Sequence, residues 1–142
     1  KAYKFTKPKV AGLNFSFSGL KTALLYFVQR ETKNNPNFVK EHLNDICASL
    51  QYTIIGILID KLKLASQETG IKRIAIGGGV SANSGIRAAL MTGEKQFGWK
   101  TYVPKFEYTT DNAAMIAIVG YLKYLEQDFT TQEITASARL KI

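Results

Sequence analysis

The sequence predicts an α/β fold, and three observations lead to it. Apolar residues recur at helical spacing in several stretches, whereas other stretches are short β-branched runs or alternate apolar with polar residues. The two kinds of stretch follow one another along the chain, which favours a partly parallel sheet connected by helices. With 142 residues, 46% of them hydrophobic, the chain is about one domain long and can bury a core. We therefore expect residues 1–142 to form a single α/β lobe.

The individual elements are predicted from spacing and from the residues at their ends. Ser18 is placed to cap the first helix, Gly70 to stop the long second helix, and Pro104 to close the last strand. Around 54–59 the long helix is apolar on nearly all sides, as in a helix buried against a sheet. In chain order we expect an irregular leading segment (1–12), a strand (13–17), a helix (18 to about 32), a helix (from Phe38 or Asn44 to 69), a strand (71–76), a helix (84 to about 91), a strand (99–103), a helix (111 to about 125) and a polar tail (129–142).

Composition narrows the class of protein. No apolar run approaches the roughly 18 residues of a membrane span, and the basic first residues lead into no signal-peptide core. The single cysteine, Cys47, cannot form an internal disulfide, so we expect a reducing, cytoplasmic location. Its place on the long apolar helix predicts a small buried residue rather than a nucleophile. A first residue of Lys rather than Met indicates a fragment of a longer protein.

The chain is basic, with 19 Lys and Arg against 11 Asp and Glu and a net charge of +8. Such a charge attracts polyanions, although a merely soluble basic surface explains it equally well. No aromatic platform of the kind that stacks bases is interleaved with the basic residues. The sequence therefore permits a nucleic acid partner but does not establish one. Two basic groups occur along the chain: Lys61, Lys63, Lys72 and Arg73, and Lys1, Lys4, Lys7 and Lys9.

Three consecutive glycines, at 77–79, form the most informative motif. They follow the strand expected at 71–76 and precede a helix that Ser81, Asn83 or Ser84 can cap. Glycine permits a sharp turn and the close approach of another group, and amide N–H groups at a helix start favour an anion such as phosphate. The pattern is neither GxGxxG nor GxxxxGK(S/T), so neither common nucleotide fingerprint applies. Taken alone, the run is explained equally well by a plain strand-to-helix connection.

A second motif surrounds Asp111, at the expected start of the last helix. Its carboxylate suits two roles, an N-cap that Thr110 could share, or a ligand of a hard or borderline metal at a cleft edge. The residues alone favour the N-cap. The only histidine, His42, is expected at the surface or edge of the long helix. Neither a His–His metal pair nor a Ser–His–Asp triad can therefore form within this chain.

Three segments together resemble one family. They are NFSFSGLKT (14–22), GGGVSAN (77–83) and TDNAAMIA (110–117). In this order and spacing they resemble the C-terminal part of the TsaD family, the tRNA N6-adenosine threonylcarbamoyltransferases, formerly labelled O-sialoglycoprotein endopeptidases or glycoproteases. The resemblance extends from about residue 10 to residue 127. It implies the C-terminal lobe of the actin-like ATPase, sugar kinase and Hsp70 superfamily fold, in which two lobes close over a nucleotide. It also implies transfer of a threonylcarbamoyl group from its adenylate to the adenosine beside the tRNA anticodon.

The resemblance implies roles for four residues. Asn83 would match an asparagine of the adenylate site, and Gly78 and Gly79 would lie beside the nucleotide. Asp111 would match an aspartate that binds a divalent metal together with two histidines of a His-x-x-x-His helix, with Fe²⁺ as the first choice and Zn²⁺ as the alternative. That helix and the Ser-Gly-Gly-His loop belong to the family's N-terminal lobe and are absent from these 142 residues. We therefore expect the fragment alone to be inactive and to expose an apolar face where that lobe would pack.

The implied partners are threonylcarbamoyl-adenylate, tRNA, the missing N-terminal lobe and the companion subunits of the bacterial modification complex, without a membrane. Three alternatives stay open at this point. They are another carbamoyltransferase or kinase of the same superfamily, a metalloendopeptidase as in the older family label, and a non-catalytic binding module. The endopeptidase has no support from the residues, because no His-Glu-x-x-His motif occurs.

Overall fold

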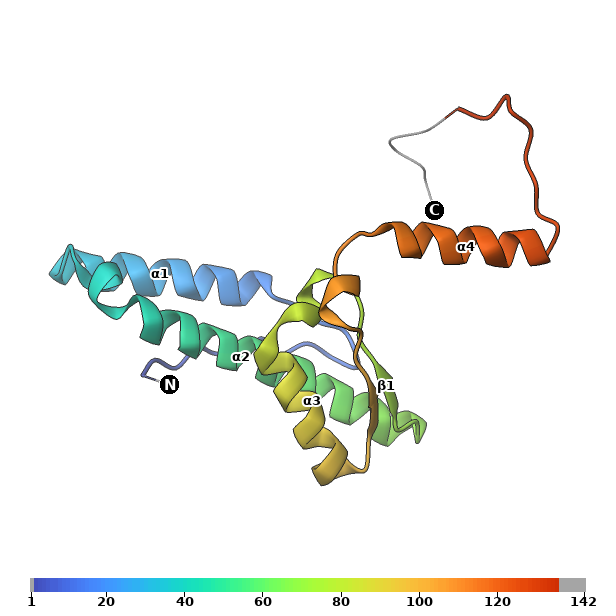
Figure 1. Ribbon diagram of the computed structural model, residues 1–142. Coiled ribbons are helices and arrows are strands. Elements are labelled where there is room, and N and C mark those ends of the chain that lie inside the picture. The colour runs from blue at the N-terminus through green and yellow to red at the C-terminus, as the bar shows by residue number, and fades with distance from the viewer. Residues whose placement is uncertain (1, 136–142) are drawn as a thin grey trace.

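The computed structural model describes residues 2–135, most of which are helical (Figure 1). Two long helices lie side by side, a smaller unit of two strands and one helix packs against the second of them, and a last helix projects away. The elements are α1 (Ser18–Asn34), α2 (Phe38–Thr69), β1 (Arg73–Ala75), the 3-10 helix η1 (Gly79–Ala82), α3 (Ser84–Phe97), β2 (Lys100–Tyr102), the 3-10 helix η2 (Phe106–Tyr108) and α4 (Ala113–Leu125). The predicted order of helices and strands is thus confirmed except at 13–17.

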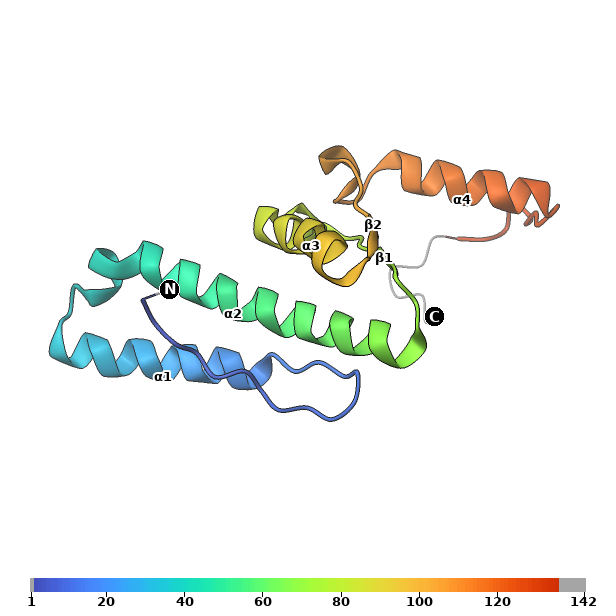
Figure 2. The same ribbon diagram turned by 90° about the horizontal axis from the view of Figure 1, so that it is seen from below.

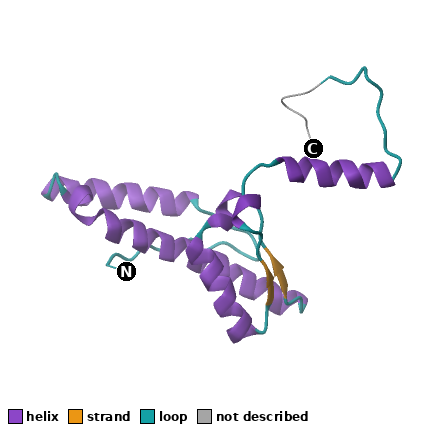
Figure 3. Ribbon diagram, in the orientation of Figure 1, coloured by secondary structure: helices purple, strands orange, loops and turns teal. Residues whose placement is uncertain are grey.

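The two strands form a parallel pair, as predicted (Figure 3). Both are shorter than expected. Within the predicted strand 71–76 only Ile74 is buried, whereas Ile71 is 59% exposed and lies before the ladder. The sheet is therefore covered on one face only, and the prediction of a strand buried within a sheet is wrong for 71–76. The residues paired across the strands are Arg73 and Lys100, Ile74 and Thr101, and Ala75 and Tyr102.

The strand predicted for 13–17 is wrong. These residues form a loop in which the rings of Phe15 and Phe17 stack, with centroids 6.3 Å apart. A strand needs a neighbouring strand to satisfy its backbone hydrogen bonds, and the sheet within residues 2–135 contains only β1 and β2. Alternation of apolar and polar residues is therefore not sufficient for a strand here.

The two long helices begin and end close to the predicted positions. Phe17 occupies the N-cap position of α1 without a side-chain hydrogen bond, so the prediction of Ser18 as the cap is wrong by one residue. The Ser18 hydroxyl instead lies 3.2 Å from that of Ser16. α2 ends at Thr69 because Gly70 adopts a left-handed conformation with φ 72°, as predicted.

Both predicted starts of α2 have a structural counterpart. The helix begins at Phe38, but His42 has the non-helical φ and ψ angles of −117° and 16°. The regular helix therefore resumes close to Asn44. The half-buried His42 ring packs on the Phe38 ring at a centroid distance of 4.7 Å. His42 lies at the helix edge, as predicted, and takes part in packing.

The core consists of two apolar clusters on two sides of α2, towards α3 and towards α1 (Figure 2). The first cluster, around Leu90 and Trp99, joins α2 to α3 and the sheet. The second, around Phe5 and Leu20, joins α2 to α1 and the leading segment. Because α2 is contacted from both sides, its residues around 54–59 are apolar on nearly all sides.

The leading segment has no helix or strand over residues 2–12, as predicted, and runs along the α1–α2 pair (Figure 2). Lys7 forms an ion pair with Asp60 of α2. The Lys61 ammonium donates to the Val10 carbonyl at 2.8 Å. Lys7 and Lys61 therefore hold this segment on the helix, and their charges are engaged within the described chain.

Cys47 is exposed, so the prediction of a buried cysteine is wrong. Its helical neighbours Ile46 and Ser49 are buried. Consecutive helical residues are rotated by about 100° around the axis, which turns Cys47 away from the covered side of α2.

α4 projects from the rest of the structure, and none of its residues is buried (Figure 1). A helix that is apolar all round normally lies in the interior of a larger protein. The expected exposed apolar face is therefore present. Its exposed apolar side chains are Met115, Ile116, Ile118, Val119, Tyr121, Leu122, Tyr124 and Leu125.

Beyond α4, residues 129–135 form no helix or strand, as predicted, and the rest of the predicted tail, 136–142, lies outside the described residues. None of the helices in the described part of the chain combines the length and the apolar character needed to cross a bilayer.

Candidate functional site

The glycine turn, residues 77–83, connects β1 to α3 through η1. Gly78 has φ 75°, a conformation that is strained for a residue with a Cβ atom. A Cβ atom at Gly77 or Gly79 would meet no atom within 4 Å, so the described chain leaves the space in front of them open. The amide N–H groups of these three glycines have no acceptor among residues 2–135. Unpaired backbone donors in a glycine turn suit an anion.

Asn83 ends the glycine turn and caps α3. Its side-chain oxygen accepts a hydrogen bond from the Ile86 amide at 3.1 Å, and its side-chain nitrogen donates to the Gln51 side-chain oxygen at 3.2 Å. Of the three predicted cap residues, Asn83 is therefore the one that the structure uses. Since a side-chain amide carries two N–H donors, one remains for a ligand. A ligand would meet a side chain already oriented by α2 and α3.

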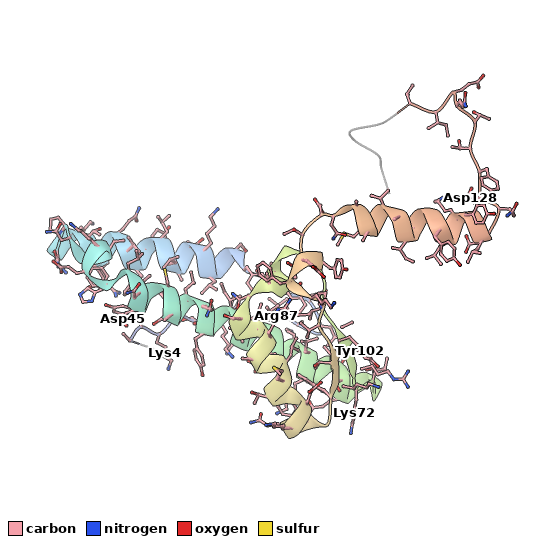
Figure 4. All side chains as sticks on the ribbon, viewed as in Figure 1. Lys4, Asp45, Lys72, Arg87, Tyr102 and Asp128 are labelled. Carbon is pink, nitrogen blue, oxygen red and sulfur yellow. The ribbon has the colours of Figure 1, made fainter. Side chains whose placement is uncertain are left out.

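Arg87 joins the glycine turn to the segment that leads to Asp111 (Figure 4). Its Nε donates to the Ser81 carbonyl at 2.7 Å, and its Nη2 donates to the Pro104 carbonyl at 2.9 Å. The side chain is half-buried, and no carboxylate of residues 2–135 pairs with it. A rigid guanidinium that donates to two carbonyls fixes both segments. Sequence patterns did not single out Arg87, although its position one helical turn after Asn83 is a signal that could have done so.

A second set of contacts holds β2 on α3. The Glu94 carboxylate accepts from the Thr101 hydroxyl at 2.6 Å and from the Thr101 amide at 2.8 Å. The hydrogen bond from the Thr101 hydroxyl is the larger cause, and that from the Thr101 amide the smaller, of a Glu94 pKa below its ordinary value. The buried Trp99 ring lies where a Cβ atom at Gly93 would be, with its Cε3 only 2.3 Å from that position. β2 is therefore fixed at its start by close packing and along its length by hydrogen bonds.

An apolar cavity of about 260 Å³ opens beside the glycine turn. Phe15 and aliphatic side chains of α2 form much of its lining, and Gly77, Val80 and Ser81 form the part next to the turn. Ser81 is 3% exposed, and its hydroxyl has no hydrogen-bond partner among residues 2–135. The cavity can therefore receive an apolar group that brings one hydrogen-bonding atom.

Asp111 is exposed and does not cap α4, so the N-cap interpretation favoured by the residues is wrong. Asn112 is the cap, and its side-chain oxygen accepts from the Met115 amide at 3.2 Å. Thr110 contributes only its carbonyl, which accepts from the Asn112 side-chain nitrogen at 2.8 Å. Within residues 2–135 no hydrogen bond or ion pair engages the Asp111 carboxylate. It is therefore available to a ligand.

Asp111 alone does not make a metal site, because a divalent ion is held by several ligands. In the described part of the chain no three His, Cys, Asp or Glu residues gather where they could hold an ion. Arg87 joins the segments that carry the glycine turn and Asp111, but no hydrogen bond links Asp111 to the turn within residues 2–135. An exposed carboxylate can supply one ligand of a metal site, and the described part of the chain places no further ligands beside it.

Known proteins of one kind match this chain. A sequence model described as tRNA N6-adenosine threonylcarbamoyltransferase matches residues 1–118. A relative from Christiangramia forsetii that carries this name is 71% identical over 141 residues, which cover 99% of this chain and 42% of the relative. Relatives of the same name from Riemerella anatipestifer and Porphyromonas gingivalis are 55% and 45% identical over 99% of this chain and 41% of each relative. The chain therefore spans less than half the length of the curated relatives that it matches.

Proposed function

Because the chain belongs to the family of tRNA N6-adenosine threonylcarbamoyltransferases, we propose that it forms the C-terminal lobe of such an enzyme. The complete enzyme would have the two-lobed actin-like fold and transfer a threonylcarbamoyl group from its adenylate to adenosine in tRNA. The glycine turn follows the carboxyl end of a parallel strand, where nucleotides bind in open α/β sheets. The opposite lobe would come from residues outside this chain.

The glycine turn is the observation that carries this proposal. Its three amide N–H groups have no acceptor among residues 2–135, and the space where Cβ atoms would stand on these glycines is open. Gly78 and Gly79 would approach the nucleotide through their backbone, and Asn83 would contact it through its remaining N–H. The neighbouring apolar cavity would receive an apolar part of the adenylate, with the Ser81 hydroxyl as its polar contact.

The residues of this chain would bind and orient the donor. In the transfer, the adenosine amino nitrogen forms a bond to the carbamoyl carbon and loses one proton to solvent. The bond from that carbon to the phosphate oxygen breaks, and AMP leaves. Negative charge therefore grows on the phosphate as the bond breaks. Fixed N–H donors aimed at growing charge lower the barrier because they need no reorganisation. The glycine turn, held by Asn83 and Arg87, supplies such donors.

Asp111 would be the ligand that this chain contributes to a divalent metal, Fe²⁺ in the first place and Zn²⁺ as the alternative. Its exposed carboxylate has no partner within residues 2–135, which supports that role. The two histidines expected from the family would complete the site from outside the chain. When bound, the metal would supply a Lewis acid that polarises the carbamoyl group.

The partners proposed with this function are those that the family resemblance implies: threonylcarbamoyl-adenylate, tRNA, the N-terminal lobe and the companion subunits, without a membrane. The proposed cytoplasmic location is the reducing compartment that the single cysteine favours. The basic chain, with a net charge of +8, is consistent with a polyanionic partner.

The test uses a joined protein, made by fusing this chain to the segment of the Christiangramia forsetii relative that precedes the matched residues. We expect it to form threonylcarbamoyladenosine in tRNA when threonylcarbamoyl-adenylate is supplied. A folded joined protein that forms none, or that phosphorylates a sugar instead, would overturn the proposal. The second outcome would favour the kinase alternative within the same superfamily.

The metal assignment is tested on the same joined protein by elemental analysis after exposure to Fe²⁺ or Zn²⁺. Asp111→Ala should remove most of the bound metal, because one carboxylate ligand is lost. Asp128→Ala is the matched control, since Asp128 is exposed and pairs with Lys123 at the other end of α4. If Asp111→Ala and Asp128→Ala retain equal metal, Asp111 is not a ligand.

A further inference from the structure

The uncovered face of the two-stranded sheet carries charges that the fold does not explain. Arg73 and Lys100 are direct partners in the ladder, so their side chains lie on the same face. Both are exposed, and neither forms an ion pair with another described residue. Like charges that face each other across neighbouring strands are destabilising. A polyanion bound on this face would remove that cost.

Tyr102 extends this face. Tyr102 lies on the same side of β2 as Lys100, is 46% exposed, and has its ring 5.6 Å from the Lys100 ammonium (Figure 4). We define the basic sheet surface as Arg73, Lys100 and Tyr102.

A packing role for this surface is disfavoured by its composition. Burying Arg73 and Lys100 under a helix or another lobe would take two unpaired charges out of water, and the attraction of a partner charge would not offset that desolvation. The inner face of the same strands has the opposite character, since Ile74 is buried against α2 and α3. The alternation along β1 and β2 therefore indicates one face for packing and one for an anionic partner.

We propose that the basic sheet surface binds the phosphate backbone of RNA, and, resting on the function proposed above, that this RNA is the tRNA substrate. Phosphates match unpaired Lys and Arg side chains, and the exposed Tyr102 ring can stack on an unpaired base. Arg73 and Lys100 each lie four residues before Gly77 and Pro104 at the site. At 3.3 Å per strand residue the separation is about 13 Å, so one RNA can contact both the surface and the site.

The experiment measures binding of an unmodified tRNA transcript to the full chain by fluorescence anisotropy over a range of salt concentrations. Arg73→Gln combined with Lys100→Gln should lower the slope of log affinity against log salt by about 2, or about 1 per lost phosphate contact. The affinity in about 0.1 M salt should fall at least about tenfold. Melting temperature is recorded for every variant, and removal of the facing like charges should not lower it.

Two further variants make the result specific. Arg73→Lys combined with Lys100→Arg keeps both charges and should bind like the parent. Lys33→Gln combined with Lys40→Gln removes the same charge from the far end of the α1–α2 pair, where both lysines are exposed, and should also leave the slope unchanged. The proposal is overturned if R73Q/K100Q shows the parent's slope of log affinity against log salt. It is also overturned if the Lys33 and Lys40 variant lowers that slope as much as R73Q/K100Q does. Transfer to tRNA is measured separately, on the joined protein. A binding result that contradicts the basic sheet surface is therefore distinguishable from a transfer result that contradicts the proposed function.

Discussion

At the residue scale, the candidate site depends on backbone donors that side chains hold in place. Gly78 has the left-handed φ that forms the turn, and Asn83 caps α3, the helix that follows. Arg87 links the turn, through the Ser81 carbonyl, to the Pro104 carbonyl. None of these side chains needs to react. Their effect is to hold N–H groups and the Asp111 segment in place before a ligand arrives, which is the basis of preorganised binding.

Arg87→Ala should loosen both segments that the guanidinium joins. A hydrogen bond to a charged group contributes about 1.5–3 kcal/mol, so amide exchange should become at least about tenfold faster on both sides. The amides to follow are those of Ser81 and Asn83 in the turn, of Tyr108 in η2 and of Thr109, which directly follows η2. Arg30→Ala is the control, because exposed Arg30 pairs with its neighbour Glu31, lies over the Phe27 ring of its own helix and contacts neither segment. Faster exchange on one side alone would contradict a joint role.

Asn112→Ala should weaken the start of α4, and Asp111→Ala should not. Loss of an N-cap side chain costs about 1 kcal/mol, which corresponds to about fivefold faster exchange of the Met115 amide. Comparison of the two variants separates the capping role of Asn112 from the proposed metal-binding role of Asp111. A larger effect of Asp111→Ala on Met115 exchange would restore the cap role to Asp111.

Thr101→Val should change the acid titration of Glu94. The lowered pKa of Glu94 gives the folded state an advantage above the ordinary carboxyl pKa, which is lost as the pH falls through the lowered value. Removing the Thr101 hydroxyl should raise that pKa towards its ordinary value, though not fully, since the Thr101 amide still donates. A carboxyl NMR titration measures the change, and an unchanged Glu94 pKa would contradict the hydrogen bond.

At the scale of elements, α3 is held to β2 by a contact that leaves no room for a methyl group. Gly93→Ala should destabilise the chain by about 1–3 kcal/mol, because its Cβ would overlap the buried Trp99 ring. Gly120→Ala in α4 is the control, since its Cβ would meet nothing within 4 Å and should strengthen the helix by up to about 1 kcal/mol. Urea unfolding measures the first and helix content the second. Equal stability of Gly93→Ala and the parent would contradict the packing of Trp99.

Most helix ends could be predicted from the sequence because local signals determine them, but α3 runs to Phe97, beyond the predicted end near residue 91. Gly70 stops α2 by its own conformation, and the two possible starts of α2 reflect the kink at His42. The strand at 13–17 could not be judged in this way, since a strand depends on a partner elsewhere in the chain. The N-cap of α4 is Asn112 rather than the neighbouring Asp111. Both residue types suit an N-cap, so the sequence does not distinguish them, and the local backbone conformation determines which one caps the helix. The role of Arg87 could not be predicted from a residue pattern, because its acceptors are backbone carbonyls, which every residue has.

At the scale of the whole molecule, α2 organises two clusters, and α4 remains without a partner in the described chain. The exposed apolar side chains of α4 and the open space before the glycine turn are both consistent with a missing lobe. The relatives, of which this chain covers about 42%, have the additional length that such a lobe requires. The basic sheet surface differs from both, because it suits an anionic partner.

The central claim is that the glycine turn forms the nucleotide-binding wall of this lobe. It is tested most directly by titrating the isotope-labelled joined protein with threonylcarbamoyl-adenylate and following amide NMR shifts. We predict that the largest changes occur at Gly77, Gly78 and Gly79, whose N–H groups are unpaired, and at the Asn83 side chain. Saturable changes confined to other parts of the chain, with these four signals unmoved, would contradict the claim.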